Sequence, residues 1–132
     1  MIKRILSTTT WAVVALTVGS QTCDAAEGKK VLKHLVMYKF RDDVKPADVQ
    51  QVIDTFAVLP KKIDSIIGFE HGANVSEEGK SDGLTYCFVV TFRDKAGLER
   101  YLKHPAHAEY VKVVAPRREK VVVFDYWSAE RD

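Results

Sequence analysis

The sequence predicts an α+β fold in which two strand–helix–strand units form one domain. A length of 132 residues fits a single compact domain. Segments with strand-like patterns alternate with segments whose apolar residues have helical spacing, in the order βαβ–βαβ. The composition, 46% hydrophobic and 29% charged, is that of a globular protein and excludes general disorder. A net charge of only +2 argues against a nucleic-acid binder, because such domains usually carry a concentrated basic stripe.

Residues 1–26 are expected to be a secretory signal that precedes a folded domain at 27–132. Two basic residues stand near the start, a short apolar run follows at 11–18, and small residues come next. The run is far shorter than the roughly 20 residues of a membrane-spanning helix, so we expect a secreted or periplasmic protein without a stable membrane anchor. The alternative is an uncleaved anchor. Cleavage after Ala25 leaves Cys87 as the only cysteine, and cleavage after Ser20 is the rival.

The first strand–helix–strand unit follows this leader. Val31–Phe40 is rich in β-branched and aromatic residues and predicts a strand. Pro46 suits the first turn of a helix, because its missing N–H would be unpaired there anyway. Apolar residues at helical spacing continue to Leu59, and Pro60 is expected to close or kink the helix. Ile66–Val75, interrupted by two glycines, predicts the second strand.

The second unit begins after a polar turn that contains glycines. Leu84–Phe92 shows the clearest alternation and predicts a strand. Asp94 is expected to cap a helix over Lys95–Lys103, and His104-Pro105 to restart the helix on a new axis. Lys120–Trp127, a continuous apolar and aromatic run, predicts the last strand.

Two such units predict a ferredoxin-like fold: a four-stranded antiparallel sheet with the helices on one face. The other face of such a sheet should be polar if it meets water. Here the first, third and last strands are apolar on both faces, and two helices cannot cover both. We therefore expect a homodimer in which a second copy of the sheet covers the open face.

Six stretches of the sequence together match a known pattern. They are the opening Lys33–Phe40, Gly68-Phe69 with Gly72, Tyr86–Phe92, Leu98–Leu102, His104-Pro105-Ala106-His107 and Val123–Tyr126. On these pieces the chain resembles the stress-responsive α/β-barrel (Dabb) domain family over roughly Lys33–Trp127. The resemblance implies a ferredoxin-like protomer whose dimer closes two sheets into a barrel. It also implies either an unassigned stress-related role or, as in a plant polyketide cyclase of this family, aldol closure of a poly-β-ketone.

The resemblance to the cyclase supplies the candidate site. Its two catalytic histidines correspond to His34 and His107, and a pocket tyrosine corresponds to Tyr101. A second pocket tyrosine aligns with Phe56, which lacks the hydroxyl, so any ligand should be smaller or more apolar there. We add Tyr38 and His104 as further candidate pocket residues.

The chemistry of these side chains agrees with that assignment, and each also has a structural interpretation. A neutral histidine can take a proton near pH 7, and a tyrosine hydroxyl can stabilise an enolate oxygen. Alternatively, His34 is a core histidine, His107 ties a helix to the first strand, Tyr101 belongs to the core and His104 caps a helix.

Other kinds of site receive less support from the sequence. Four histidines without paired spacing do not predict a metal site, and no cofactor is expected. Cys87 is expected to be a buried, unreactive thiol. Arg117, Arg118 and Lys120 are expected to form a solvated turn between the last helix and the last strand.

Two hypotheses from different classes follow. One is a dimeric stress-response or ligand-binding protein without turnover. The other is a cofactor-independent cyclase or lyase acting on a small apolar or carbonyl compound, with His34 and His107 as acid and base and Tyr101 as donor. Convergence of these three side chains on one cavity discriminates between them.

Overall fold

The computed structural model describes residues 29–129, which form one four-stranded sheet and four helices. The strands lie in the order β2-β3-β1-β4, and every neighbouring pair is antiparallel. The elements in chain order are β1 (Lys30–Phe40), α1 (Pro46–Ala57), α2 (Leu59–Lys62), β2 (Ile66–Ala73), β3 (Tyr86–Phe92), α3 (Lys95–Lys103), α4 (Pro105–Val114) and β4 (Arg118–Ala129).

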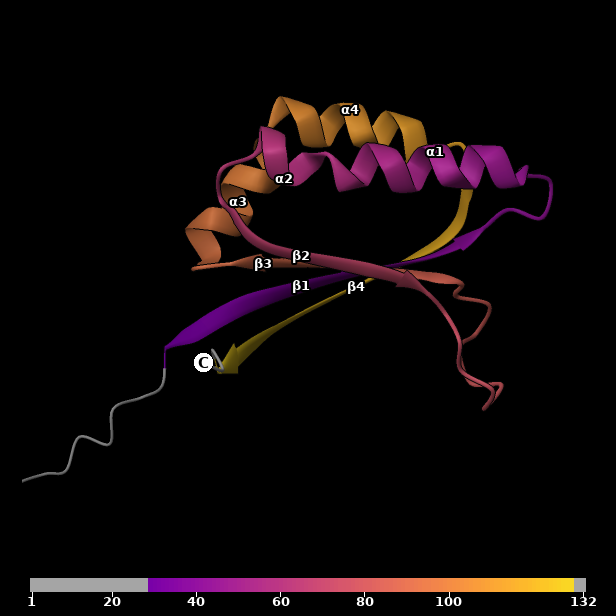
Figure 1. The fold of residues 1–132 in the computed structure, drawn as a ribbon, viewed down its shortest axis with the longest axis horizontal. Coiled ribbons are helices and arrows are strands. Elements are labelled where there is room, and N and C mark those ends of the chain that lie inside the picture. The colour runs from indigo at the N-terminus through magenta and orange to yellow at the C-terminus, as the bar shows by residue number, and fades with distance from the viewer. Residues whose placement is uncertain (1–28, 130–132) are drawn as a thin grey trace, which may run out of the picture.

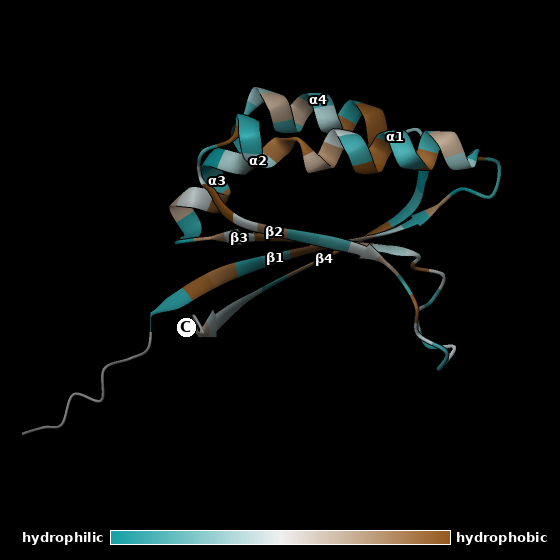
Figure 2. Cartoon of the chain, viewed as in Figure 1, coloured by the Kyte–Doolittle hydropathy of each residue, from teal (hydrophilic) through white to brown (hydrophobic). Residues whose placement is uncertain are grey.

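All four helices lie on one side of the sheet, as Figure 1 shows, and the other side is open. This arrangement confirms the predicted ferredoxin-like α+β fold. Along α1 the polar and apolar stretches alternate (Figure 2), which is the pattern of a helix with one buried side. Asp94 caps α3 as expected, because its carboxylate accepts a hydrogen bond from the Gly97 backbone N–H at 2.7 Å.

The core lies between the sheet and the helices. Alternate residues of β1 and β3 point into it, and the register of these strands places their inward residues opposite one another. The fully buried side chains include an aromatic stack in which the ring centroids of Phe56 and Phe88 are 4.1 Å apart. The largest buried side chains are Tyr101, Tyr110, Phe56, Phe88, Phe92, Leu59 and Ile63.

The observed ends of α1 and β4 differ from the ends that the sequence predicts. Pro60 does not close α1, which ends at Ala57; Pro60 instead lies in the first turn of α2, where its missing N–H costs nothing. The last strand begins at Arg118, two residues before the predicted start, and includes a β-bulge opposite Lys39 and Phe40.

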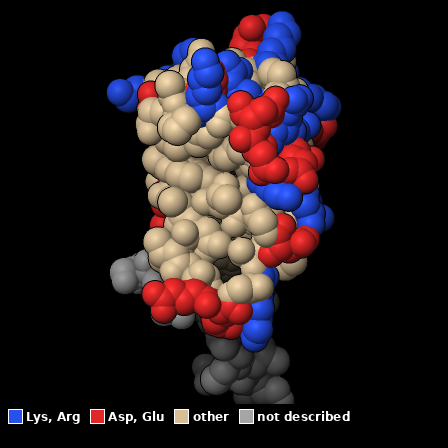
Figure 3. Space-filling view, turned by 90° about the vertical axis from the view of Figure 1, so that its right-hand side faces the viewer, with Lys and Arg blue, Asp and Glu red and all other residues tan. Residues whose placement is uncertain are grey.

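The open face of the sheet carries apolar side chains, as the alternation predicts. Leu35, Met37 and Val89 share this face with Phe124, which is 59% exposed. On the side of the molecule shown in Figure 3, a broad uncharged surface is bordered by Lys, Arg, Asp and Glu. Such a surface is typical of a protein–protein interface.

None of the helices within residues 29–129 is long and apolar enough to cross a membrane. The predicted secretory signal, residues 1–26, lies outside the described residues.

Candidate functional site

A cavity of about 320 Å³ lies between the β1–β4 side of the sheet and the helices α3 and α4. It brings together side chains from five elements, and five of the six predicted site residues are among them. The lining residues include His34, Val36 and Tyr38 of β1, Phe56 of α1, Tyr101 of α3, His107, Tyr110 and Val111 of α4, and Arg118, Val121, Val123 and Asp125 of β4.

His34 is held in place by a carboxylate of the neighbouring strand. β1 and β4 pair so that His34 lies directly opposite Asp125, and His34 Nδ1 is 2.6 Å from Asp125 Oδ1. A carboxylate accepts the hydrogen bond, so Nδ1 carries the proton and the lone pair of the neutral ring is on Nε2. His34 is buried, whereas the Asp125 side chain is 41% exposed.

Tyr101 lies between the two histidines. Its ring centroid is 5.8 Å from that of His34 and 4.5 Å from that of His107. The side chain is almost fully buried, and this burial raises the pKa of the Tyr101 hydroxyl above its ordinary value. The hydroxyl therefore keeps its proton at neutral pH and is a donor in this cavity.

His107 is placed by the turn between α3 and α4. His104 ends α3, Pro105 starts α4 on a new axis, and the first turn of α4 carries His107 over Tyr101. Burial lowers the pKa of the half-buried His107 imidazole, and the neighbouring His34 adds to this effect. The Leu102 backbone opposes it. The neutral form, which accepts protons, is thereby favoured.

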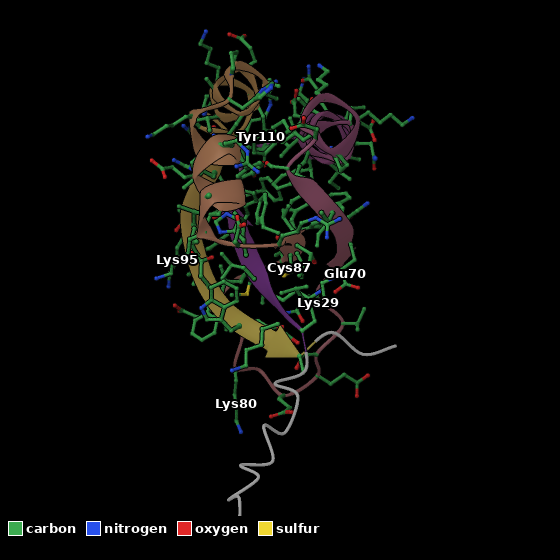
Figure 4. All side chains as sticks on the ribbon, turned by 90° about the vertical axis from the view of Figure 1, so that its left-hand side faces the viewer. Lys29, Glu70, Lys80, Cys87, Lys95 and Tyr110 are labelled. Atoms are coloured by element: carbon green, nitrogen blue, oxygen red, sulfur yellow. The ribbon has the colours of Figure 1, made fainter. Side chains whose placement is uncertain are left out.

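The opposite end of the cavity is lined by hydroxyls and one guanidinium. The Tyr110 hydroxyl donates to the Tyr38 hydroxyl over 3.1 Å, and both tyrosines are buried. Figure 4 shows Tyr110 on the inner side of α4. Burial raises the pKa of Tyr38, and the hydrogen bond from Tyr110 and the positive charge of the Arg118 guanidinium oppose that shift.

The predicted pocket residues fall in two places. Phe56 and Tyr38 line the cavity together with the three predicted catalytic residues. His104 does not line it. Its ring caps α4, with Nδ1 accepting from the Ala106 backbone N–H at 3.0 Å, and it borders a separate surface hollow. This is the capping role that the sequence offers as the alternative for His104.

Sequence reasoning misses three of the polar lining residues. Asp125 interrupts an apolar strand, and this interruption is the signal that could have identified it. Tyr110 lies on the apolar face of α4 and is not distinguishable from a core residue by pattern. Arg118 belongs to the stretch expected to be a solvated turn; that expectation is wrong for Arg118, because it is the first residue of β4 and lines the cavity.

Cys87 lies apart from this cavity. Cys87 is on the open face of the sheet and is half-buried rather than buried; its pKa is raised by burial and by Glu70, which disfavours the thiolate. A hollow of about 360 Å³ adjoins it beside the 74–85 loop, without a histidine in its lining. Within residues 29–129 no group of three or more His, Cys, Asp or Glu is arranged to hold a metal ion.

Geometry and topology together define the class of protein. It is a ferredoxin-like α+β domain with a partly enclosed cavity that holds two histidines, a protonated tyrosine and a carboxylate. The chain belongs to the Stress responsive A/B Barrel Domain (Dabb) family, whose sequence model matches residues 32–128. The predicted resemblance is therefore confirmed.

Relatives in this family carry different names. The chain is 34% identical to the stress-response A/B barrel domain-containing protein HS1 of Arabidopsis thaliana, over 76% of this chain and 92% of that protein. It is 30% identical to olivetolic acid cyclase of Cannabis sativa, over 72% of this chain and 94% of the cyclase. A solved structure of a dimeric ferredoxin-like protein from Jannaschia is 30% identical, with a TM-score of 0.62, and covers 73% of this chain and 97% of that one.

Proposed function

We propose that the cavity binds a small carbonyl compound and transfers protons on it, using side chains of this chain alone. The observation that carries the proposal is the convergence of His34, Tyr101 and His107 on one cavity. Catalysis of aldol-type closure or cleavage requires a base and a hydrogen-bond donor near the same carbonyl group, and the cavity supplies both.

Each side chain has a role in this proposal. Neutral His107 takes a proton from the carbon next to the carbonyl group, and the C–H electron pair forms the enolate. The Tyr101 hydroxyl donates a hydrogen bond to the enolate oxygen. His34, held by Asp125, orients the site and lends its Nε2 as a second acceptor or, once protonated, as a donor.

The family relationship supports this proposal and also supports a simpler one. Similarity to olivetolic acid cyclase extends over nearly the whole domain and favours acid–base chemistry. The somewhat higher identity to the stress-response protein HS1 favours a second candidate, a stress-response protein that binds a ligand without turnover.

Hydrogen–deuterium exchange at carbon separates the two candidates without knowledge of the natural substrate. Phenylacetone in D₂O at neutral pD is followed by proton NMR as its C–H positions next to the carbonyl exchange. We expect the protein to accelerate this exchange, and His107→Gln and Tyr101→Phe to lose most of the acceleration. His71→Gln, which changes an exposed histidine outside the cavity, is the matched control and should act as wild type.

A wild-type protein that does not accelerate exchange, or acceleration that survives both cavity variants, would refute proton transfer. Folding of every variant is checked by circular dichroism, so that loss of structure is not mistaken for loss of chemistry.

We also propose that the protein is an exported homodimer. The apolar open face of the sheet and the dimeric relative from Jannaschia support the dimer.

The charged start of the sequence and the short apolar run that follows it support export. Intact mass of the protein from its native host should show a chain that begins between Gln21 and Glu27, and a full-length chain held in membranes would contradict export.

A further inference from the structure

The β-bulge in β4 determines which charge faces the cavity. Lys39 pairs with Lys120, but Phe40 pairs with Arg118, so Glu119 is the extra residue. In a regular ladder Glu119 would lie opposite Phe40, on the side that faces the helices. The bulge puts Arg118 there instead and leaves Glu119 to form an ion pair with Lys39 at 2.9 Å.

Arg118 has no carboxylate partner among the described residues. Within residues 29–129 it forms no ion pair with Asp or Glu, whereas its neighbour Arg117 contacts Asp48 at 3.4 Å and Gln51 at 2.8 Å. A guanidinium that lines a cavity without an acidic partner has N–H groups available for an anion.

The two tyrosines beside Arg118 add a directed donor. The Tyr38 oxygen accepts a hydrogen bond from the Tyr110 hydroxyl. This bond uses a lone pair of Tyr38 and leaves the Tyr38 proton for a ligand in the cavity that Arg118 also lines. We infer that Arg118 and Tyr38 bind the carboxylate of an elongated organic acid in this cavity.

The shape of the cavity sets the class of acid. His34 and Tyr38 are four residues apart on β1, which is roughly 13 Å along a strand. The lining between them is aliphatic, formed by the paired Val36 and Val123, and Val121 continues it opposite Tyr38. The ligand is therefore a carboxylic acid with an apolar chain, and its reactive carbonyl group lies several carbons from the carboxylate.

This inference rests on the cavity of the proposed function, and it is tested by binding alone. The probes are octanoate and octanamide, which have the same chain and differ in charge at neutral pH. Titration calorimetry with the full chain should show that octanoate binds at least about tenfold more tightly, the effect of one charge-assisted hydrogen bond in a partly enclosed site.

Variants test whether the Arg118 guanidinium causes the preference for octanoate over octanamide. Arg118→Gln should equalise the affinities of the two probes, and Arg118→Lys should keep part of the preference. Arg117→Gln is the matched control and should keep all of it. Equal affinities in the wild type, no binding of either probe, or a tenfold preference that persists in Arg118→Gln would overturn the inference. A retained octanoate preference without carbon exchange would leave this inference standing and refute proton transfer.

Discussion

The side chain of His107 shows how local burial prepares chemistry. The imidazole is half-buried over Tyr101, and its pKa is lowered mainly because the charged form loses water contacts. A base that stays neutral down to pH values below 6.5 is available for proton abstraction across the physiological range.

The lowered pKa of His107 has a consequence for stability. As the pH falls below about 6.5, the unfolded chain takes up a proton at this position that the folded chain does not, so the free energy of unfolding decreases until the folded pKa is reached. His107→Gln removes this contribution. We expect the variant to lose less stability than wild type between pH 7.5 and pH 5, measured by urea unfolding at both values.

Identical losses of stability in His107→Gln and wild type would contradict a lowered pKa. An NMR titration of the imidazole in the wild-type protein gives an independent readout, because the midpoint should lie below the ordinary value for histidine.

At the scale of elements, the α3–α4 turn positions the site, and Asp94 fixes the start of α3, the helix that leads into that turn. Asp94→Ala removes the hydrogen bond to the Gly97 N–H and should lower the free energy of unfolding by about 1 kcal/mol, measured by urea unfolding. Asp64→Ala, a change at an exposed residue outside the helices, is the control and should fall within about 0.5 kcal/mol of wild type. Equal effects of the two changes would mean that the cap does not stabilise α3.

The sequence was sufficient for the elements that depend on local pattern. Alternation predicts the strands, and Asp94 and Pro105 predict both helix starts around the site, because capping and proline geometry are local. Features that depend on how the strands pair could not be predicted from the sequence. The bulge that turns Arg118 into the cavity depends on the β1–β4 register, and the Asp125 contact with His34 depends on the same register.

For the whole molecule, the open sheet face is the feature that determines assembly. Burying apolar area contributes roughly 25 cal/mol per Å² to association. We expect sedimentation analysis to show a wild-type dimer at micromolar concentration. Val89→Glu and Phe124→Glu should each give a monomer, because the charge would be buried between two sheets without a partner.

Val58→Glu is the control for these variants, because Val58 is a partly exposed apolar residue between α1 and α2, on the helical side of the sheet. It should remain dimeric. A monomeric wild-type protein, or a Phe124→Glu variant that remains dimeric, would show that the open face does not form the interface.

Strand β4 also affects how the protein reaches its native state. It is one of the two edge strands, 12 residues long and largely apolar, and its outer edge pairs with no other strand among residues 29–129. A newly folded protomer therefore exposes a template to which other extended chains can add, so productive assembly competes with aggregation. Because off-pathway growth rises with concentration, refolding yield should be highest in dilute solution, where each protomer meets a folded copy before it meets unfolded chains.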